Sequence, residues 1–167
     1  AIQDFDQAIA LNPKDASAFY NRGITYTNLE QFDKVIQDFD QAIGLNPKHA
    51  KAFDGRGAAY TNLGQFKQAI QDFDQTIKLN PKNANAFYNR GTAYANLGQF
   101  KQAIQDFDQA IKLNPKNANA FYNSGAAYAN LGQFDRAIQD FDQAIALNPK
   151  DVEVFYNRGN AYAKLKQ

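Results

Sequence analysis

The sequence predicts an all-α fold made of stacked 34-residue helix-turn-helix repeats. Two observations lead to this prediction. One is a six-residue word, AFYNRG, which occurs at 18–23 and 86–91 and returns in altered form as AFDGRG, AFYNSG and VFYNRG. The other is the spacing of the prolines, each 34 residues after the last: Pro13, Pro47, Pro81, Pro115 and Pro149. An unbroken period of this length is typical of a solenoid, in which each repeat packs only on its neighbours.

The period divides the chain into a single array over residues 1–167. Half a repeat, the second helix of a pair, is expected at 1–15, and the other half, a first helix, at 152–167. Four full repeats lie between them: 16–49, 50–83, 84–117 and 118–151. The chain does not begin with Met, so we expect a fragment or a processed product.

Each predicted helix of the representative repeat 84–117 has a stop signal. The first helix is expected over 84–97, because Gly98 is a good left-handed cap for a helix C-terminus. The second is expected from about 101 to 113, because the residue before Pro115 is driven out of helical geometry. Each repeat is therefore a pair of antiparallel helices with short joints.

The junctions between repeats carry capping residues. The residues placed to cap the next first helix are His49, Asn83, Asn117 and Asp151. One junction inside a repeat departs from the pattern, because Glu30 stands where the other repeats have glycine. If a left-handed conformation is needed there, Glu30 should cost about 1 kcal/mol.

Composition excludes several classes of function. Eighteen basic and seventeen acidic residues give a net charge of +1, too balanced to indicate nucleic-acid or anionic-membrane binding. There is no cysteine, so disulfides, thiolate nucleophiles and cysteine metal sites are impossible. No apolar run approaches the roughly 20 residues of a membrane span. The first residues alternate apolar side chains with Asp and Gln, unlike a signal peptide. These features do not identify the cellular compartment of the protein, and we expect a cytoplasmic location by default.

No constellation of residues suggests catalysis. His49 is the single histidine and lies in a turn between repeats, while Ser17 and Ser124 have no histidine to activate them. The aspartates recur with the repeat and form no unique acid–base pair or metal cage. We therefore expect no enzymatic activity, no catalytic residue, no metal and no cofactor.

Helical periodicity separates the faces of the first helix. At about 100° per residue, Phe87 and Gly91 fall on the packed face, whereas Tyr88 and Asn89 fall on the opposite face. Glycine on the packed face lets the neighbouring helix come close.

Arg90 falls near the centre of the packed face, where a guanidinium needs partners. We hypothesise that Asp106 of its own repeat or Asp72 of the adjacent repeat holds it. Ser124 takes this place in one repeat and is the natural exception.

The pattern resembles the tetratricopeptide repeat family, through large aromatic, Gly, Tyr, Ala and Pro positions at the family's spacing: Phe87, Gly91, Tyr94, Ala103, Phe107, Ala110 and Pro115. The resemblance covers the whole chain. It departs where the family usually has leucine and this chain has Arg22, Arg56, Arg90 and Arg158. The resemblance implies a right-handed α-α superhelix whose first helices line a concave groove that binds ligands.

The resemblance places a row of tyrosines and asparagines on the concave face. Tyrosine offers rigid contact area with a polar tip, and asparagine offers both a donor and an acceptor to an extended peptide. The asparagine row resembles the ladder of O-linked N-acetylglucosamine transferases, and Asp54-Gly55 interrupts it. The candidate peptide-binding residues are Tyr20, Asn21, Tyr88, Asn89, Asn96, Tyr122, Asn123, Asn130, Tyr156 and Asn157.

The function expected is that of a protein-interaction scaffold that binds a protein or an extended peptide. Two alternatives stay open: a substrate-recruiting arm of a larger enzyme, such as a glycosyltransferase, and a purely structural spacer whose face is only a soluble surface. Partners that offer a terminal carboxylate, as chaperone C-termini do, are disfavoured because the face carries only Lys51 and Lys164 as cations.

Both ends of the array are expected to expose apolar side chains. Residues 152–167 of one molecule could pack on residues 1–13 of the next, a head-to-tail contact that propagates. The side chains involved would be Ile2, Phe5 and Ile9 at one end and Phe155, Tyr162 and Leu165 at the other.

Overall fold

The computed structural model describes residues 1–166 and contains α-helices and short connections. No strand occurs in this range, and none of its helices is long and apolar enough to cross a membrane. The helices are α1 (Ile2–Leu11), α2 (Ala16–Thr27), α3 (Phe32–Leu45), α4 (Ala50–Asn62), α5 (Phe66–Leu79), α6 (Ala84–Asn96), α7 (Phe100–Leu113), α8 (Ala118–Asn130), α9 (Phe134–Leu147) and α10 (Val152–Leu165).

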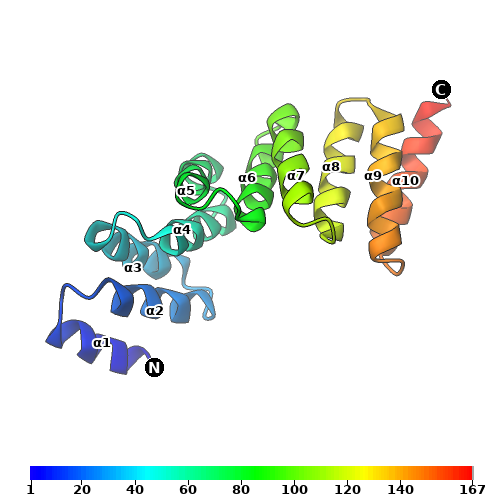
Figure 1. The fold of residues 1–167 in the computed structure, drawn as a ribbon. Helices are drawn as coiled ribbons and strands as arrows, with labels where there is room; N and C mark the ends of the chain where they lie inside the picture. The colour runs from blue at the N-terminus through cyan, green and yellow to red at the C-terminus, as the bar shows by residue number, and fades with distance from the viewer. Residues whose placement is uncertain (167) are drawn as a thin grey trace. The chain divides into compact units, whose positions relative to one another are not determined.

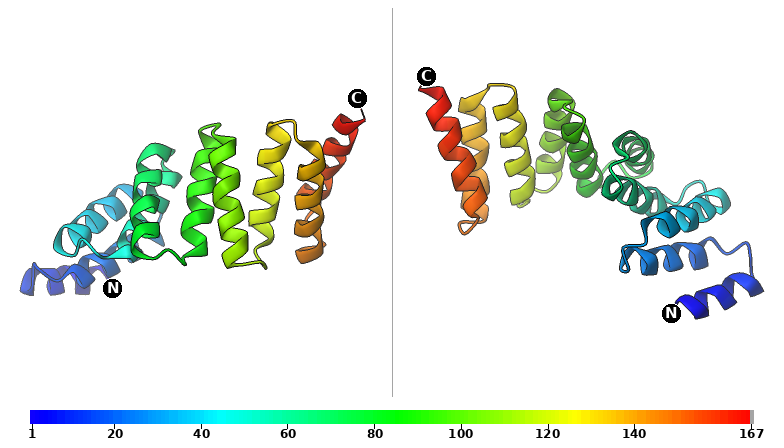
Figure 2. Two further views of the ribbon diagram at one scale, coloured as in Figure 1. Left: turned by 45° about the horizontal axis from the view of Figure 1, so that its top comes forward. Right: turned by 180° about the vertical axis from the view of Figure 1, so that it is seen from behind.

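The helices form two compact units, Ala1–Pro81 with α1 to α5 and Lys82–Gln167 with α6 to α10. Inside each unit, helices that follow one another in the chain pack side by side (Figures 1 and 2). Each first helix packs most extensively on the second helix of its own repeat, as α6 does on α7 and α8 on α9. The predicted fold class, stacked pairs of α-helices, is confirmed.

The helix ends follow the predicted stop signals to within a residue. In the representative repeat the first helix ends at Asn96, and Gly98 follows with a φ of 72°. The second helix begins at Phe100, one residue earlier than expected. Glu30 does adopt the left-handed conformation, with a φ of 55°, so the expected strain is present there.

The predicted N-caps are confirmed. The side chain of Asn83 accepts hydrogen bonds from the backbone N–H groups of Asn85 and Ala86. His49 does the same through Nδ1, which accepts from the N–H of Ala52 at 3.2 Å. Each cap satisfies donors that the first turn of a helix leaves unpaired.

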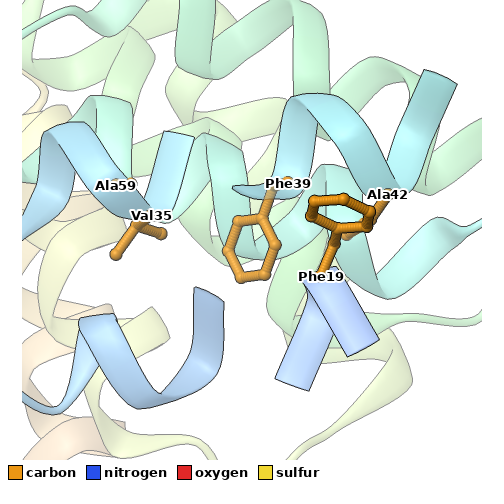
Figure 3. Close-up of a cluster of buried hydrophobic side chains, with 6 residues drawn as sticks. Phe19, Val35, Phe39, Ala42 and Ala59 are labelled. Carbon is orange, nitrogen blue, oxygen red and sulfur yellow. The ribbon is translucent and has the colours of Figure 1, made fainter. Parts of the chain in front are cut away.

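The core of each unit is a row of phenylalanines from the second helices, fully buried at Phe39, Phe73 and Phe107. Figure 3 shows the first of these, Phe39, between Val35 and Phe19. Glycines of the first helices make room for these rings. A Cβ placed on Gly91 would lie 2.8 Å from a ring carbon of Phe107, closer than side-chain atoms approach. The close approach predicted for this glycine is therefore confirmed.

Candidate functional site

Two neighbouring hollows lie across the first helices of the second unit. The smaller hollow has a volume of about 150 Å³ and lies between α6 and α8. Asn96, Asn123 and Asn130 line it over a floor that includes Phe100 and Phe107. The larger hollow, of about 390 Å³, lies between α8 and α10. The two hollows lie on either side of α8 and share its residues Ala126 and Asn130, and we call the two hollows together the amide groove.

The larger hollow adds an aromatic floor and two opposite charges. Phe134 and Phe141 form the floor, and Tyr122 lines one side. Glu153 and Lys164, both from α10, supply one negative and one positive charge. Apolar floor and amide-bearing walls together suit a ligand that buries an apolar group and offers hydrogen bonds around it.

Tyrosine and asparagine side chains are linked from one repeat to the next. The amide of Asn123 donates to the hydroxyl oxygen of Tyr88 at 3.0 Å, and Asn157 donates to Tyr122 at 2.9 Å. Each tyrosine ring also lies against the phenylalanine of its own second helix, as Tyr88 does at 6.0 Å from Phe107. These tyrosines are therefore half-buried and fixed in place, rather than projecting freely from the helix as the helical wheel suggested.

A second row of asparagines keeps its carbonyl oxygens outward. Asn62, Asn96 and Asn130 each donate through the side-chain amide to a backbone carbonyl one turn earlier, at 2.8–2.9 Å. This bond occupies the nitrogen side of the amide and leaves the oxygen as an acceptor on an exposed residue. The row thus offers acceptors to the N–H groups of a ligand.

The structure brings together part of the predicted site. Asn96, Tyr122, Asn123, Asn130 and Asn157 line the amide groove. The other predicted residues lie outside its lining: Tyr20 and Asn21 in α2, Tyr88 and Asn89 in α6, and Tyr156, 69% exposed, in α10.

Sequence reasoning missed the aromatic floor. Phe100 and Phe134 stand at the first position of a second helix, and the sequence contained their signal, because this aromatic recurs in every full repeat. The resemblance places the groove on the first helices alone and so leaves out the starts of the second helices. Glu153 and Lys164 belong to rows on the same face but were not chosen as site residues.

The first unit has a different arrangement at the same positions. Asp54 and Gly55 replace the tyrosine and asparagine in α4, so the chain offers Tyr20 no asparagine at the linking position. The ring of Tyr20 instead lies 4.6 Å from that of His49. Burial raises the pKa of Asp54, and within residues 1–166 its Oδ1 has no hydrogen-bond partner.

Tyr122 is the most strongly perturbed titratable group that lines the groove. Burial, together with the 2.6 Å hydrogen bond that its hydroxyl donates to the carboxylate of Glu153, raises the pKa of Tyr122 to about 12. The hydroxyl therefore stays protonated at neutral pH and acts as a fixed donor and acceptor. It performs no acid–base chemistry in that range.

Arginines of the first helices link the second helices beside them. In the first unit, Arg56 donates through Nε and Nη2 to the buried carboxylate of Asp72, at 2.8 and 2.6 Å. Its Nη1 bonds to Asp40 on the preceding second helix. Arg22 repeats this pattern with Asp38 and Asp6. The paired carboxylates raise the pKa of both guanidinium groups, so each arginine stays charged.

Arg90 bonds to Asp106 of its own repeat, at 2.7 and 2.6 Å, as one branch of the hypothesis required. Asp72, the other candidate, is the partner of Arg56. The bidentate geometry explains why a guanidinium is tolerated on the packed face.

Residues 1–166 contain no group of three or more His, Cys, Asp or Glu side chains placed to hold a metal ion.

Family models for the tetratricopeptide repeat match most of this chain. The model described as "Tetratricopeptide repeat" matches 16–49 and 84–117, and a related one matches 107–139. A third, "TPR repeat", matches 1–30, 57–98 and 125–166. The chain belongs to the tetratricopeptide repeat family. A search of curated protein sequences finds no match to it.

Solved structures of tetratricopeptide repeat proteins share the fold. One is YrrB, described as having an unusual peptide-binding site, which is 28% identical and has a TM-score of 0.87. That similarity covers 99% of this chain and 86% of YrrB. Another is the first TPR of Spaghetti (RPAP3), bound to the HSP90 peptide SRMEEVD. It is 25% identical with a TM-score of 0.69, over 71% of this chain and 94% of the other. MamA, at 24% identity and a TM-score of 0.86, covers 89% of this chain and 87% of its own, and shows the fold alone.

Proposed function

We propose that this chain is a protein-interaction scaffold that binds an extended peptide in the amide groove of α6, α8 and α10. The observation that carries the proposal is the row of asparagines along an aromatic floor. Extended peptide backbone exposes N–H and C=O groups at regular intervals, and asparagine can pair with both. YrrB and the RPAP3 repeat domain, which bind peptides, support this reading by similarity.

The charge of the groove bears on the kind of peptide. Its lining residues include Glu153 and Lys164 and no other charged side chain within the described part of the chain. A clamp for a terminal carboxylate needs several cations close together. We therefore infer a largely uncharged segment that places an apolar side chain over Phe134 and Phe141.

The test is a peptide-display selection against the chain, followed by affinity measurements on variants of one asparagine row. Asn96→Ala with Asn130→Ala should weaken the selected peptide about 10-fold or more, because each loses an acceptor in a desolvated groove. Asn62→Ala is the matched control, since Asn62 makes the same backbone bond but lies outside both hollows. Equal weakening by the control, or binding that survives the double change, would count against the amide groove.

We also propose head-to-tail self-association through the exposed face of α10. Phe155, Tyr162 and Leu165 are 43–44% exposed on this helix. Arg158 bonds to one aspartate, Asp142. The side chain of Asp4 in α1 is 87% exposed, and in the proposed contact Asp4 of the next molecule provides Arg158 with a second carboxylate. A mass that rises with concentration in light scattering, and stops rising in a Tyr162→Asp variant, is expected. A constant monomer mass at high concentration would refute the association and leave the peptide proposal standing.

A further inference from the structure

We propose that Asp108 and Asp140, together with the hydroxyl of Ser124, form a binding site for a guanidinium group, supplied by an arginine of a partner or by a free guanidinium ion. The site lies at the packing of α8 with α7 and α9, apart from the amide groove. We call it the 108/140 carboxylate pair.

The other repeats show what such a pair of carboxylates holds. In the first unit, Arg56 accounts for both: two bonds to Asp72 of its own repeat and one to Asp40 of the preceding second helix. Asp140 and Asp108 occupy these two places around Ser124, 16 residues away on either side. Serine is too short to span them, so its repeat keeps two carboxylates without the cation that joins them elsewhere.

Unsatisfied atoms mark this place. Ser124 is fully buried; its Oγ makes no hydrogen bond of good geometry within residues 1–166, but it lies close enough to Asp140 to lower the pKa of that carboxyl. The Oδ2 of Asp140 is likewise buried and without a partner in that range. Buried polar atoms in native proteins are nearly always paired. Arg56 donates to both oxygens of its inner carboxylate, whereas a serine hydroxyl can donate to only one, so the unpaired Oδ2 of Asp140 indicates a missing donor. The guanidinium group supplies up to five N–H donors in one plane.

The charges around the site agree with this. Burial raises the pKa of Asp140, the hydroxyl of Ser124 beside it lowers that pKa, and the negative charge of Asp108 raises it again. Burial also raises the pKa of Asp108. The positive charge of Arg136 in α9 lowers the pKa of both Asp108 and Asp140. Its guanidinium lies over the ring of Tyr128, and within the described chain it forms no ion pair closer than 4.0 Å. A cation that binds between the carboxylates would stabilise the charged forms directly.

The outer edge of the site is exposed to solvent. In the arginine-containing repeats the guanidinium side chains are 18–19% exposed, and the outer carboxylates, Asp6 and Asp40, are 47–49% exposed. Asp108 holds the corresponding outer position and is itself exposed. The proposal therefore has the cation enter from the side of Asp108 and extend inward to Asp140, as the arginine side chain does in the other repeats.

The experiment is a thermal unfolding series of the full chain in millimolar guanidinium chloride, with equal NaCl and equal urea as controls. Urea has the shape of guanidinium without its charge. At ten times the dissociation constant, the unfolding midpoint should rise by about 3 °C over both controls. Ser124→Arg supplies the cation internally, and Asp140→Asn removes the inner carboxylate, so neither variant should show the rise.

A positive control comes from the first unit. Arg56→Ser creates the same arrangement between Asp40 and Asp72, and guanidinium should recover part of its lost stability. No rise in the unaltered chain, or an equal rise in Ser124→Arg, would overturn the proposal. Short peptides then decide where the guanidinium group comes from. If Gly-Arg-Gly with blocked ends also raises the unfolding midpoint, an arginine of a partner can reach the site. If only the guanidinium ion raises it, the site binds the free ion. Gly-Lys-Gly should have no effect in either case.

Discussion

The two units of this chain have nearly the same repeat sequence, and they differ at a few single positions. In the first unit, Arg22 and Arg56 each join two aspartates, while Asp54 interrupts the tyrosine row. In the second, the tyrosine–asparagine links are intact, while Ser124 replaces an arginine. The first unit thus keeps its arginine–aspartate bonds but loses a tyrosine–asparagine link, and the second unit does the reverse.

The difference shows how a repeat satisfies its polar groups. Three buried side-chain atoms lack a hydrogen-bond partner within residues 1–166: Asp54 Oδ1, Ser124 Oγ and Asp140 Oδ2. Asp54 and Ser124 depart from the repeat sequence, and Asp140 is the residue that would pair with an arginine at position 124. Polar side chains in a repeat array are matched in pairs across helices, so changing one member leaves the other unsatisfied.

The largest expected effect comes from making the same change in both units. Asp72→Asn should lower the free energy of unfolding by about 2–3 kcal/mol, because Arg56 loses the charge of its buried partner. Asp140→Asn should destabilise much less, because no arginine donates a hydrogen bond to this carboxylate and Arg136 acts on it only through its charge. Urea unfolding of the two variants makes the comparison. Equal losses would mean that the arginine pairing contributes nothing specific.

Restoring the missing arginine should make the second unit resemble the first. Ser124→Arg is expected to raise the free energy of unfolding by about 1–2 kcal/mol through charge-assisted hydrogen bonds to Asp140 and Asp108. Combined with Asp140→Asn, the gain should shrink. If the single variant is no more stable in urea, the site cannot accommodate the side chain that every other repeat carries there.

The turn inside each repeat gives a smaller contrast. Glu30 has a φ of 55°, whereas Gly98 adopts 72° at the same place in the second unit. Glu30→Gly should therefore stabilise the chain by about 1 kcal/mol or slightly less. Gly98→Ala should destabilise by a similar amount, and it meets no steric clash because no atom lies within 4 Å of the added Cβ. Urea midpoints that move in the same direction in both variants would contradict the explanation.

The smallest expected effect is on pH dependence. The folded-state pKa of Asp140 is raised above its ordinary value of 3.8 by burial and by Asp108, against opposition from Arg136 and Ser124. The folded state then binds more protons than the unfolded state, so stability falls as the pH rises from 3.8 through the raised pKa. In Ser124→Arg this part of the fall should diminish. Unfolding midpoints measured from pH 3.5 to pH 7 for both proteins would detect it, and identical pH profiles would refute it.

Much of this structure could be predicted from the sequence, because the information is local. Gly98 and the prolines set the helix ends, and the 3.6-residue turn placed Phe87, Gly91 and Phe107 on packed faces. The pairing of Arg90 with an aspartate followed from the energy of burying a guanidinium without a partner. These conclusions need only the geometry of a single helix and a list of which groups can be buried.

What tertiary structure decided is how one repeat is offset from the next. The helical wheel put Tyr88 on an open face, but stacking brings Asn123, 35 residues away, to its hydroxyl. Stacking also places Phe134 at the floor of the amide groove and leaves the Oδ2 of Asp140 without a hydrogen-bond partner. Periodicity fixes directions around a helix axis, whereas contacts between repeats depend on the distance and tilt between axes, and these come from the packing of whole side chains.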